Sequence, residues 1–228
     1  EIWDALSGDK REAKAFTQHD GVTTVPLTFD PYGSIMICFN QAISATTQGD
    51  AQQNYPDLKQ VMEIDGSWTV HFDSKWGGPE TIEFPVLSDW SHSANEGIKY
   101  YSGSATYQKT FKPDFTPEQG KSYYLQLENV KDVGIATVKI NGVDKGIVWT
   151  KPFRVDISKE LKAGENTLEI KVVNSWYNRV AGDEMNPDKK HFTSTNIVLK
   201  NDFQGRPQEV IPLQPSGLIG PVIITTEE

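Results

Sequence analysis

The chain has 228 residues, enough to bury the core of one large β domain or of a medium domain with a smaller companion. Its 22 basic and 31 acidic residues give a formal net charge of −9 and form no Lys/Arg run, which argues against a nucleic-acid or membrane-surface partner. No apolar run approaches the roughly 18 residues of a membrane span. The single cysteine, Cys38, excludes an internal disulfide and is expected to be a small buried hydrophobic residue.

Short runs of alternating apolar and polar residues dominate the chain, and helical periodicity is nearly absent. Runs of this kind, bounded by Gly, Pro, Asn and Asp, predict β-strands. Their spacing predicts an all-β fold, an antiparallel β-sandwich or jelly roll with a short N-terminal β segment. In chain order the predicted strands are 23–29, 34–39, 67–73, 81–86, 104–111, 122–130, 136–140, 146–149, 167–173, 195–199 and 221–226.

A polar stretch rich in Gln, Thr and Ala, at 41–58, interrupts the strand pattern. The strands before it are too few for a stable independent sheet unless they pack on something else. We therefore expect a β segment over 1–45, a linker over 46–59 and the main domain over 60–228.

Two local features of the main domain carry structural expectations. Asn141 and Gly142 lie between β-rich runs, and this pair predicts a tight type I′ hairpin because both residues tolerate positive φ. Trp68 belongs to an alternating run and is expected in the core. Trp149 is expected to pack under a loop.

Aromatic residues make up 11% of the chain and include six tryptophans. They offer carbohydrate platforms, because the apolar face of a pyranose stacks on an aromatic ring while Asp, Asn and Arg side chains bind its hydroxyls. For each ring the alternative is a place in the core or at a sandwich end. The candidate carbohydrate-binding residues are Trp90, Tyr100, Tyr101, Trp176, Asn178, Arg179 and Asp183.

The last four of these residues fall in the run NSWYNRVAGDEM, 174–185, which follows a predicted strand and is expected to be a loop. In one interpretation Arg179 and Asp183 form a partly buried pair, and Asn178 satisfies backbone groups, so that the loop is pinned beneath Trp176. In the other interpretation the same groups face outward and bind hydroxyls. We favour the first, because a buried Arg without its partner would be costly.

No catalytic or metal-binding motif stands out. The four histidines are scattered, so a zinc site is unsupported. Hydrolysis of a glycosidic bond needs two carboxylates about 5 to 10 Å apart. A self-sufficient glycosidase would have to use carboxylates such as Asp89, Glu96 or Asp183, and none is distinguished from a solvated acidic surface. We expect no catalytic residue in this chain.

Four runs carry a resemblance to a known family. They are SWTVHFDSKWGGPETIEFPVLSDWSHSANEGIKYYSGSATYQKTF, VKINGVDKGIVWTKPFRVDIS, LEIKVVNSWYNRVAGD and PSGLIGPVII. Together they resemble the C-terminal galactose-binding-like jelly roll of bacterial α-L-rhamnosidases of glycoside hydrolase family 106, and more distantly the sugar-binding domain of family 2 enzymes. The opening run 1–39 resembles the β segment that follows the catalytic barrel. Where similar enzymes read Asn-Arg-Leu-Ile-Gly-Asp, this chain has NRVAGD at 178–183.

The resemblance implies a parent whose catalytic carboxylates lie on a (β/α)₈ barrel, which needs about 250 residues of its own. It implies that this chain is a non-catalytic accessory domain of a secreted, periplasmic or extracellular hydrolase, with that catalytic domain and carbohydrate as partners. Related sandwiches often carry a structural calcium ion, whose ligands the sequence does not assign; no other cofactor is expected. A structural or adhesive protein-interaction module is the alternative.

Overall fold

The computed structural model describes residues 1–202, 204–207 and 209–228. The chain divides into two compact units, the first formed by residues 1–59 with 227–228 and the second by residues 60–226. No helix in the described part of the chain is both long enough and apolar enough to cross a membrane.

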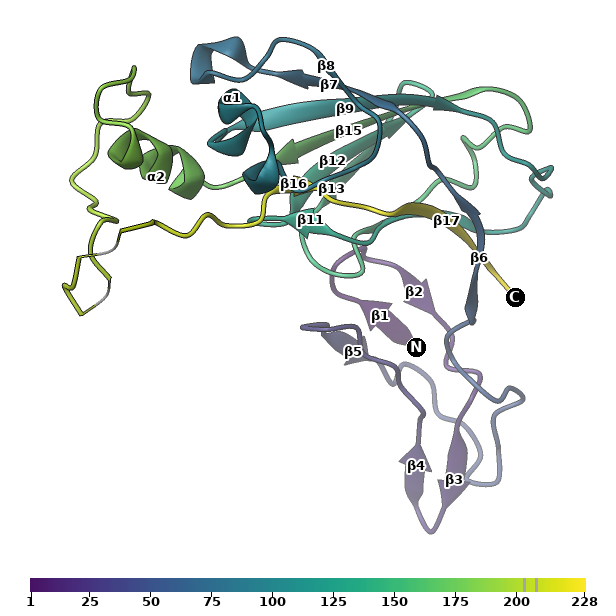
Figure 1. Ribbon diagram of the computed structural model, residues 1–228. Coiled ribbons are helices and arrows are strands. Elements are labelled where there is room, and N and C mark those ends of the chain that lie inside the picture. Colours follow the sequence, from purple (N-terminus) through teal and green to yellow (C-terminus); the bar gives the residue numbers. More distant parts are fainter. Residues whose placement is uncertain (203, 208) are drawn as a thin grey trace. The chain divides into compact units, whose positions relative to one another are not determined.

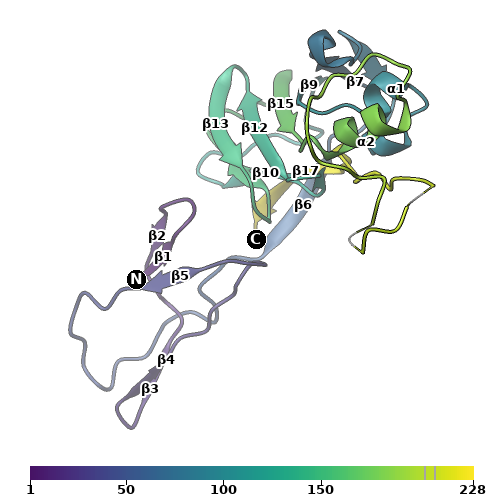
Figure 2. The same cartoon turned by 90° about the vertical axis from the view of Figure 1, so that its left-hand side faces the viewer.

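The second unit is an antiparallel β-sandwich, which confirms the predicted fold class (Figures 1 and 2). Within the described residues, its larger sheet has six strands and its smaller sheet has four. The larger sheet runs in the order β13 (Val143–Val148), β12 (Ile135–Ile140), β15 (Asn166–Val173), β9 (Ser104–Phe111), β7 (Trp68–Phe72) and β8 (Ile82–Phe84). The smaller sheet runs in the order β14 (Arg154–Asp156), β10 (Tyr123–Leu127), β17 (Val222–Glu227) and β6 (Leu58–Glu63). The short strands β11 (Val130–Lys131) and β16 (Gly217–Leu218) form a separate pair.

The core of the sandwich follows from the alternating sequence pattern. Trp68, Val70 and Phe72 of β7 are buried, as are Leu125 and Leu127 of β10, and all five belong to one hydrophobic cluster. Alternation places every second side chain on the inner face of a sheet. Burying one such large apolar side chain stabilises the fold by about 1.5–3 kcal/mol. The core position predicted for Trp68, which is 1% exposed, is confirmed.

The hairpin between β12 and β13 has the predicted turn. Ile140 pairs with Val143, and the two residues between them, Asn141 and Gly142, have φ values of 50° and 80°. Positive φ at both central positions is the requirement of a type I′ turn. Trp149, in contrast, does not pack under a loop as expected, since its exposed fraction is 59%.

Two element predictions are wrong. Residues 195–199 form no strand. The supposed loop 174–185 contains the helix α2 (Tyr177–Met185), whose residues 178–183 are all buried. Three shorter elements complete the second unit: the 3-10 helices η1 (Ser74–Trp76) and η2 (Trp90–His92), and the helix α1 (Glu96–Lys99). In both views α1 and α2 lie at the same end of the larger sheet (Figures 1 and 2).

The first unit has little core of its own. Among its described residues only Ile2, Ala15 and Asn54 are buried, and Cys38 is half-buried, so the full burial expected for this cysteine is not observed. Asn54, from the stretch expected to be a linker, accepts a hydrogen bond from the backbone of Ala15 and donates to the carbonyl oxygens of Ala15 and Pro26. The stretch 46–59 therefore packs within this unit. The strands of the unit are β1 (Ile2–Asp4), β2 (Lys10–Arg11), β3 (Thr17–His19), β4 (Val22–Thr24) and β5 (Ile35–Ile37).

Candidate functional site

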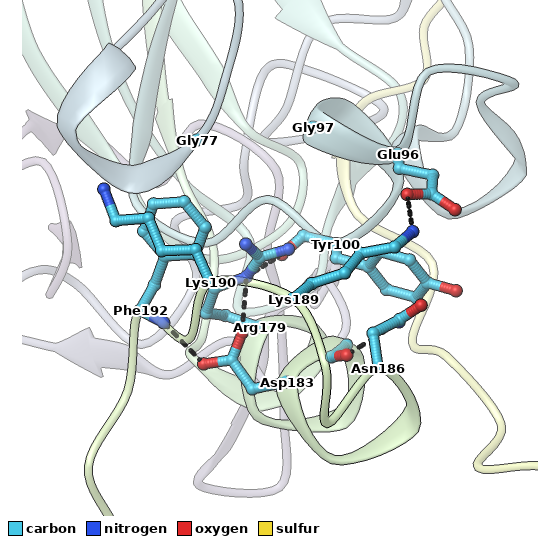
Figure 3. Close-up of a pocket in the computed structure, with 11 residues that line it drawn as sticks. Gly77, Glu96, Gly97, Tyr100, Arg179, Asp183, Asn186, Lys189, Lys190 and Phe192 are labelled. Atoms are coloured by element: carbon cyan, nitrogen blue, oxygen red, sulfur yellow. Dashed lines mark hydrogen bonds and ion pairs between the residues drawn. The ribbon is translucent and has the colours of Figure 1, made fainter.

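A cavity of about 220 Å³ lies where α1, α2 and the segment after α2 meet (Figure 3). Its walls combine aromatic rings, glycines and charged side chains. The lining residues are Gly77, Glu96, Gly97, Tyr100, Arg179, Gly182, Asp183, Asn186, Lys189, Lys190 and Phe192.

Three glycines let the walls of the cavity come together. A Cβ atom on Gly182 would lie 2.6 Å from Cγ of Tyr100, and one on Gly77 would lie 2.7 Å from Cζ of Phe192. A Cβ atom on Gly97 would lie 2.4 Å from the carbonyl oxygen of Gly77. Contacts this short are not tolerated, so both aromatic rings rest against bare backbone.

Arg179 lies at the base of the cavity with 5% of its surface exposed. Its Nε donates to the carbonyl oxygen of Tyr100 at 2.9 Å, and its Cζ lies 4.8 Å from the ring centroid of Phe192. None of the hydrogen bonds among the described residues uses its terminal nitrogens Nη1 and Nη2. Burial lowers the pKa of the guanidinium from its ordinary value, and the carboxylate of Asp183 opposes this shift. An arginine stays protonated in proteins. The cavity is therefore lined by a positively charged guanidinium whose two terminal nitrogens make no hydrogen bond to a described residue.

Asp183 holds the segment after α2 in place. Its Oδ2 accepts hydrogen bonds from the backbone nitrogens of Phe192 and Thr193, at 2.9 and 2.8 Å, and from Oγ1 of Thr193 at 2.8 Å. Its Oδ1 lies 4.0 Å from Nε of Arg179, which confirms the predicted buried pair. Because the three hydrogen bonds are much shorter than the ion-pair contact, the carboxylate acts mainly as an anchor for residues 192–193.

Two lysines line the outer part of the cavity. Lys189 forms an ion pair with Glu96, whose pKa is lowered by the hydrogen bond from this lysine. Nζ of Lys190 lies 4.8 Å from the ring centroid of Phe192. Figure 3 shows Lys190 and Arg179 both against this ring. No carboxylate of a described residue forms an ion pair with Lys190.

Of the residues proposed from the sequence, the structure brings Tyr100, Arg179 and Asp183 together in this cavity. Trp176 does not line it. The indole of Trp176 is 43% exposed and packs edge-on against Trp76, with ring centroids 4.8 Å apart. The Trp76–Trp176 pair is therefore partly exposed to solvent and separate from the lining of the cavity.

Trp90, Tyr101 and Asn178 have exposed fractions of 1%, 0% and 1%, and each makes hydrogen bonds inside the fold. Nε1 of Trp90 donates to the hydroxyl of Tyr107 at 2.7 Å, and the hydroxyl of Tyr101 donates to the carbonyl oxygen of Ser104 at 2.8 Å. These two aromatic side chains therefore hold the core together and have no surface to offer a ligand in this conformation.

Asn178 joins α2 to a distant segment. Its Nδ2 donates to the carbonyl oxygen of Gln214 and its Oδ1 accepts from the backbone nitrogen of Gln214, both at 2.8 Å. This is the backbone-satisfying role expected in the first interpretation of the run 174–185.

Sequence reasoning did not connect Asn186, Lys189, Lys190 and Phe192 with the site. The adjacent lysines in the run NPDKKHF, directly after the polar cluster, were the available signal. The sequence singles out Glu96 only as a carboxylate of the glycosidase alternative.

The remaining carboxylate of that alternative, Asp89, is also committed to the fold. Its Oδ1 accepts hydrogen bonds from the backbone nitrogens of Ser91 and Ser216, at 2.9 and 3.0 Å. Across the described residues, no group of three or more His, Cys, Asp and Glu side chains could hold a metal ion. The structure therefore assigns no ligands to the calcium ion that the resemblance allows.

Comparisons with known proteins relate the chain to glycoside hydrolases. No protein-family model matches it. The chain superposes over 99% of its length on 20% of a rhamnosidase from Novosphingobium sp. PP1Y, with a TM-score of 0.83 and 34% identity. It is 35% identical over 183 residues to a Formosa agariphila protein named as an inferred beta-glucuronidase, and 33% identical over 127 residues to a beta-glucuronidase of the same organism. These matches cover 73% and 51% of this chain, but only 16% and 12% of the two relatives.

Proposed function

We propose that this chain is a non-catalytic accessory β-sandwich of a longer bacterial glycoside hydrolase of the α-L-rhamnosidase type, equivalent to the C-terminal galactose-binding-like region of family 106 enzymes. The observation that carries the proposal is the match to the rhamnosidase, in which nearly the whole of this chain corresponds to one fifth of a larger enzyme. Its role there is to support the catalytic domain and to contact carbohydrate, in the periplasm or outside the cell.

The chemistry of the cavity supports a non-catalytic role. A glycosidase needs one carboxylate to donate a proton and a second to attack or to activate water. Both carboxylates that line the cavity are already engaged in structural interactions. Asp183 accepts three hydrogen bonds from residues 192–193, and Glu96 forms an ion pair with Lys189. Freeing Asp183 for catalysis would release the segment that forms the wall of the cavity.

The proposal is tested by incubating the 228-residue chain with a panel of aryl glycosides that includes rhamnosides and glucuronides. The expected result is no turnover. Turnover that is lost in Asp183→Asn or Glu96→Gln, and kept in the exposed control Asp188→Asn, would overturn the proposal.

The supporting role has a test of its own in the Novosphingobium rhamnosidase. Deleting the matched fifth of that enzyme is expected to reduce soluble, active protein, and replacing this fifth by the present chain is expected to restore part of it. If the deletion variant and the chimera lost the same amount of soluble, active enzyme, a scaffold role for this chain would be contradicted.

A second candidate is a module that binds another protein. It is favoured by the exposed apolar side chains of the first unit, where Phe29, Tyr32 and Phe39 have exposed fractions of 58%, 100% and 82%. Exposed apolar side chains mark an interaction site where they form one contiguous patch. If this role is the main one, replacing these three residues by Ser will abolish partner capture and leave sugar binding unchanged.

A further inference from the structure

We infer that the cavity between α1, α2 and residues 186–192 binds one sugar unit that carries a carboxylate, of the hexuronic acid class. This inference rests on the proposed contact with carbohydrate and specifies its chemistry. It follows from the charges, the uncommitted donors and the size of the cavity.

The charge of the cavity opposes that of the chain. Three basic and two acidic residues line it, whereas the whole chain carries a formal charge of −9. Both acidic groups are committed, Glu96 to Lys189 and Asp183 to the backbone of residues 192–193. The cationic donors left without a hydrogen-bond acceptor among the described residues are the terminal nitrogens of Arg179 and the ammonium of Lys190, although Arg179 lies near Asp183 and both cations contact the ring of Phe192. An anion therefore gains attraction here without displacing an existing partner.

The type of anion follows from the geometry of Arg179. Its Nε is fixed by the carbonyl oxygen of Tyr100 and its guanidinium is held against the ring of Phe192, so the orientation of the fork is set before a ligand arrives. A guanidinium presents parallel N–H groups that match the two oxygens of a carboxylate. Arg179 is only 5% exposed and has little contact with water, which strengthens its pairing with a carboxylate. Its buried N–H donors are also costly to leave without an acceptor.

The size and surface of the cavity select a single ring. Its volume of about 220 Å³ is below the roughly 300–1,000 Å³ of pockets for drug-sized ligands. The rings of Tyr100 and Phe192 supply apolar surface for the C–H face of a pyranose. One sugar residue with a carboxylate directed at Arg179 satisfies both the apolar and the cationic part of the lining.

The test is calorimetric titration of the whole 228-residue chain with sodium glucuronate and sodium galacturonate. The matched neutral probe is methyl glucuronate, the ester, which differs from glucuronate in charge while keeping the ring. We expect saturable binding of at least one uronate, with the ester at least about tenfold weaker because the charge-assisted pair is lost. Sodium acetate is the probe for a carboxylate without a ring and is expected to bind more weakly than the uronate.

Variants assign the binding to the cavity. Arg179→Lys keeps the charge but removes the fork, and is expected to weaken uronate binding about tenfold. Lys190→Gln removes an exposed charge and is expected to weaken it about two- to fivefold. Lys112→Gln makes the same change on an exposed lysine outside the cavity and should have no effect. Thermal unfolding of each variant checks that the fold is intact, and Lys190→Gln carries the test if Arg179→Lys does not fold.

Equal affinity for glucuronate and its ester, no uronate binding, or equal effects of Lys190→Gln and Lys112→Gln would each overturn the inference. Acetate binding as tightly as the uronates would overturn its sugar component. Failure of these binding tests leaves the non-catalytic role intact, whereas turnover of an aryl glucuronide by the chain would overturn that role and leave uronate binding standing.

Discussion

Gly182 lies in α2 where an added Cβ atom would approach Cγ of Tyr100 to 2.6 Å. In an exposed helix, replacing Gly by Ala gains about 1 kcal/mol from helix propensity. In this buried helix the ring of Tyr100 would have to move, and overpacking of this kind costs about 1–3 kcal/mol. We expect Gly182→Ala to lower the free energy of unfolding by about that amount in urea titrations, and to reduce binding in the cavity.

The matched control is Gly164→Ala. A Cβ atom on Gly164 would meet nothing within 4 Å, and its φ is not in the left-handed region. Its free energy of unfolding should change by less than about 0.5 kcal/mol, as is usual for surface substitutions. If both variants lost the same stability, close packing at Gly182 would not be the cause.

Glu83 gives the fold a pH dependence on its outer surface. Its carboxylate accepts hydrogen bonds from the hydroxyls of Thr69 and Ser67, at 2.6 and 2.8 Å, and these lower its pKa in the folded state, Thr69 having the largest effect. A carboxyl whose pKa is depressed by folding contributes stability that is present above the unfolded pKa, near 4.5, and is lost as the pH falls through the folded pKa. We therefore expect Glu83→Gln to lower the unfolding midpoint at pH 7 and to have a smaller effect at pH 3.

The control for this prediction is Glu80→Gln. It removes the same charge from an exposed position that is near Glu83 in the sequence. Thermal unfolding at both pH values compares the two variants with the parent chain. An identical loss from Glu83→Gln at pH 7 and pH 3 would show that the hydrogen-bonded charge is not the cause.

At the scale of elements, α2 connects three parts of the chain through its side chains. The carboxylate of Asp183, which is 7% exposed, holds residues 192–193 by accepting three hydrogen bonds. Asp183→Asn keeps the shape but replaces charge-assisted hydrogen bonds by neutral ones. We expect a loss of about 2–3 kcal/mol in the free energy of unfolding, together with faster hydrogen exchange at the amides of Phe192 and Thr193.

Asp188→Asn is the control, because Asp188 is exposed and follows the same helix. It removes one negative charge without removing a buried acceptor. Protection of the amides of Phe192 and Thr193 that survives in Asp183→Asn would contradict the anchoring role.

The strand predicted at 195–199 and the loop predicted at 174–185 failed for different reasons. The apolar run 195–199 has strand composition, yet the carboxylate of Glu184 accepts hydrogen bonds from the backbone nitrogens of Leu199 and Lys200, at 2.8 and 2.9 Å. In α2 the first helical residue follows Trp176, which makes no side-chain cap, so the usual start signal is missing. The Arg179–Asp183 spacing of four residues was the helical signal that the sequence did contain.

At the scale of the whole molecule, the sandwich was predictable and the cavity was not. Alternation fixes which face of a strand is buried, whatever its partner. The cavity instead needs Gly77, Glu96 and Tyr100 beside residues 179–192, and these meet only through the folded topology. Sequence reasoning found Arg179 and Asp183 because a paired cation and carboxylate are costly to bury separately.

The two units should also differ in their resistance to unfolding. The hydrophobic cluster of buried residues runs from Ile64 to Ile224, whereas the described part of residues 1–59 buries only two apolar side chains, Ile2 and Ala15. A unit of about 60 residues is marginal even with a full core. We expect limited trypsin digestion to cut first within residues 1–59, after Lys10, Arg11 or Lys14, and to leave a resistant fragment of the second unit. Simultaneous loss of both units on a time course would contradict this expectation.

The side-chain anchors on α2 also bear on how such a domain can diversify. The chain leaves the helix at Asn186, is fastened to it by Asp183 at residues 192–193, and is fastened again by Asn178 at Gln214. Glu184 of the same helix also holds residues 199–200, and an insertion between any two of these attachment points costs little entropy, since doubling a loop adds only about 0.6 kcal/mol. Insertions in this segment can therefore change which ligands reach the cavity while the two sheets of the sandwich stay unchanged.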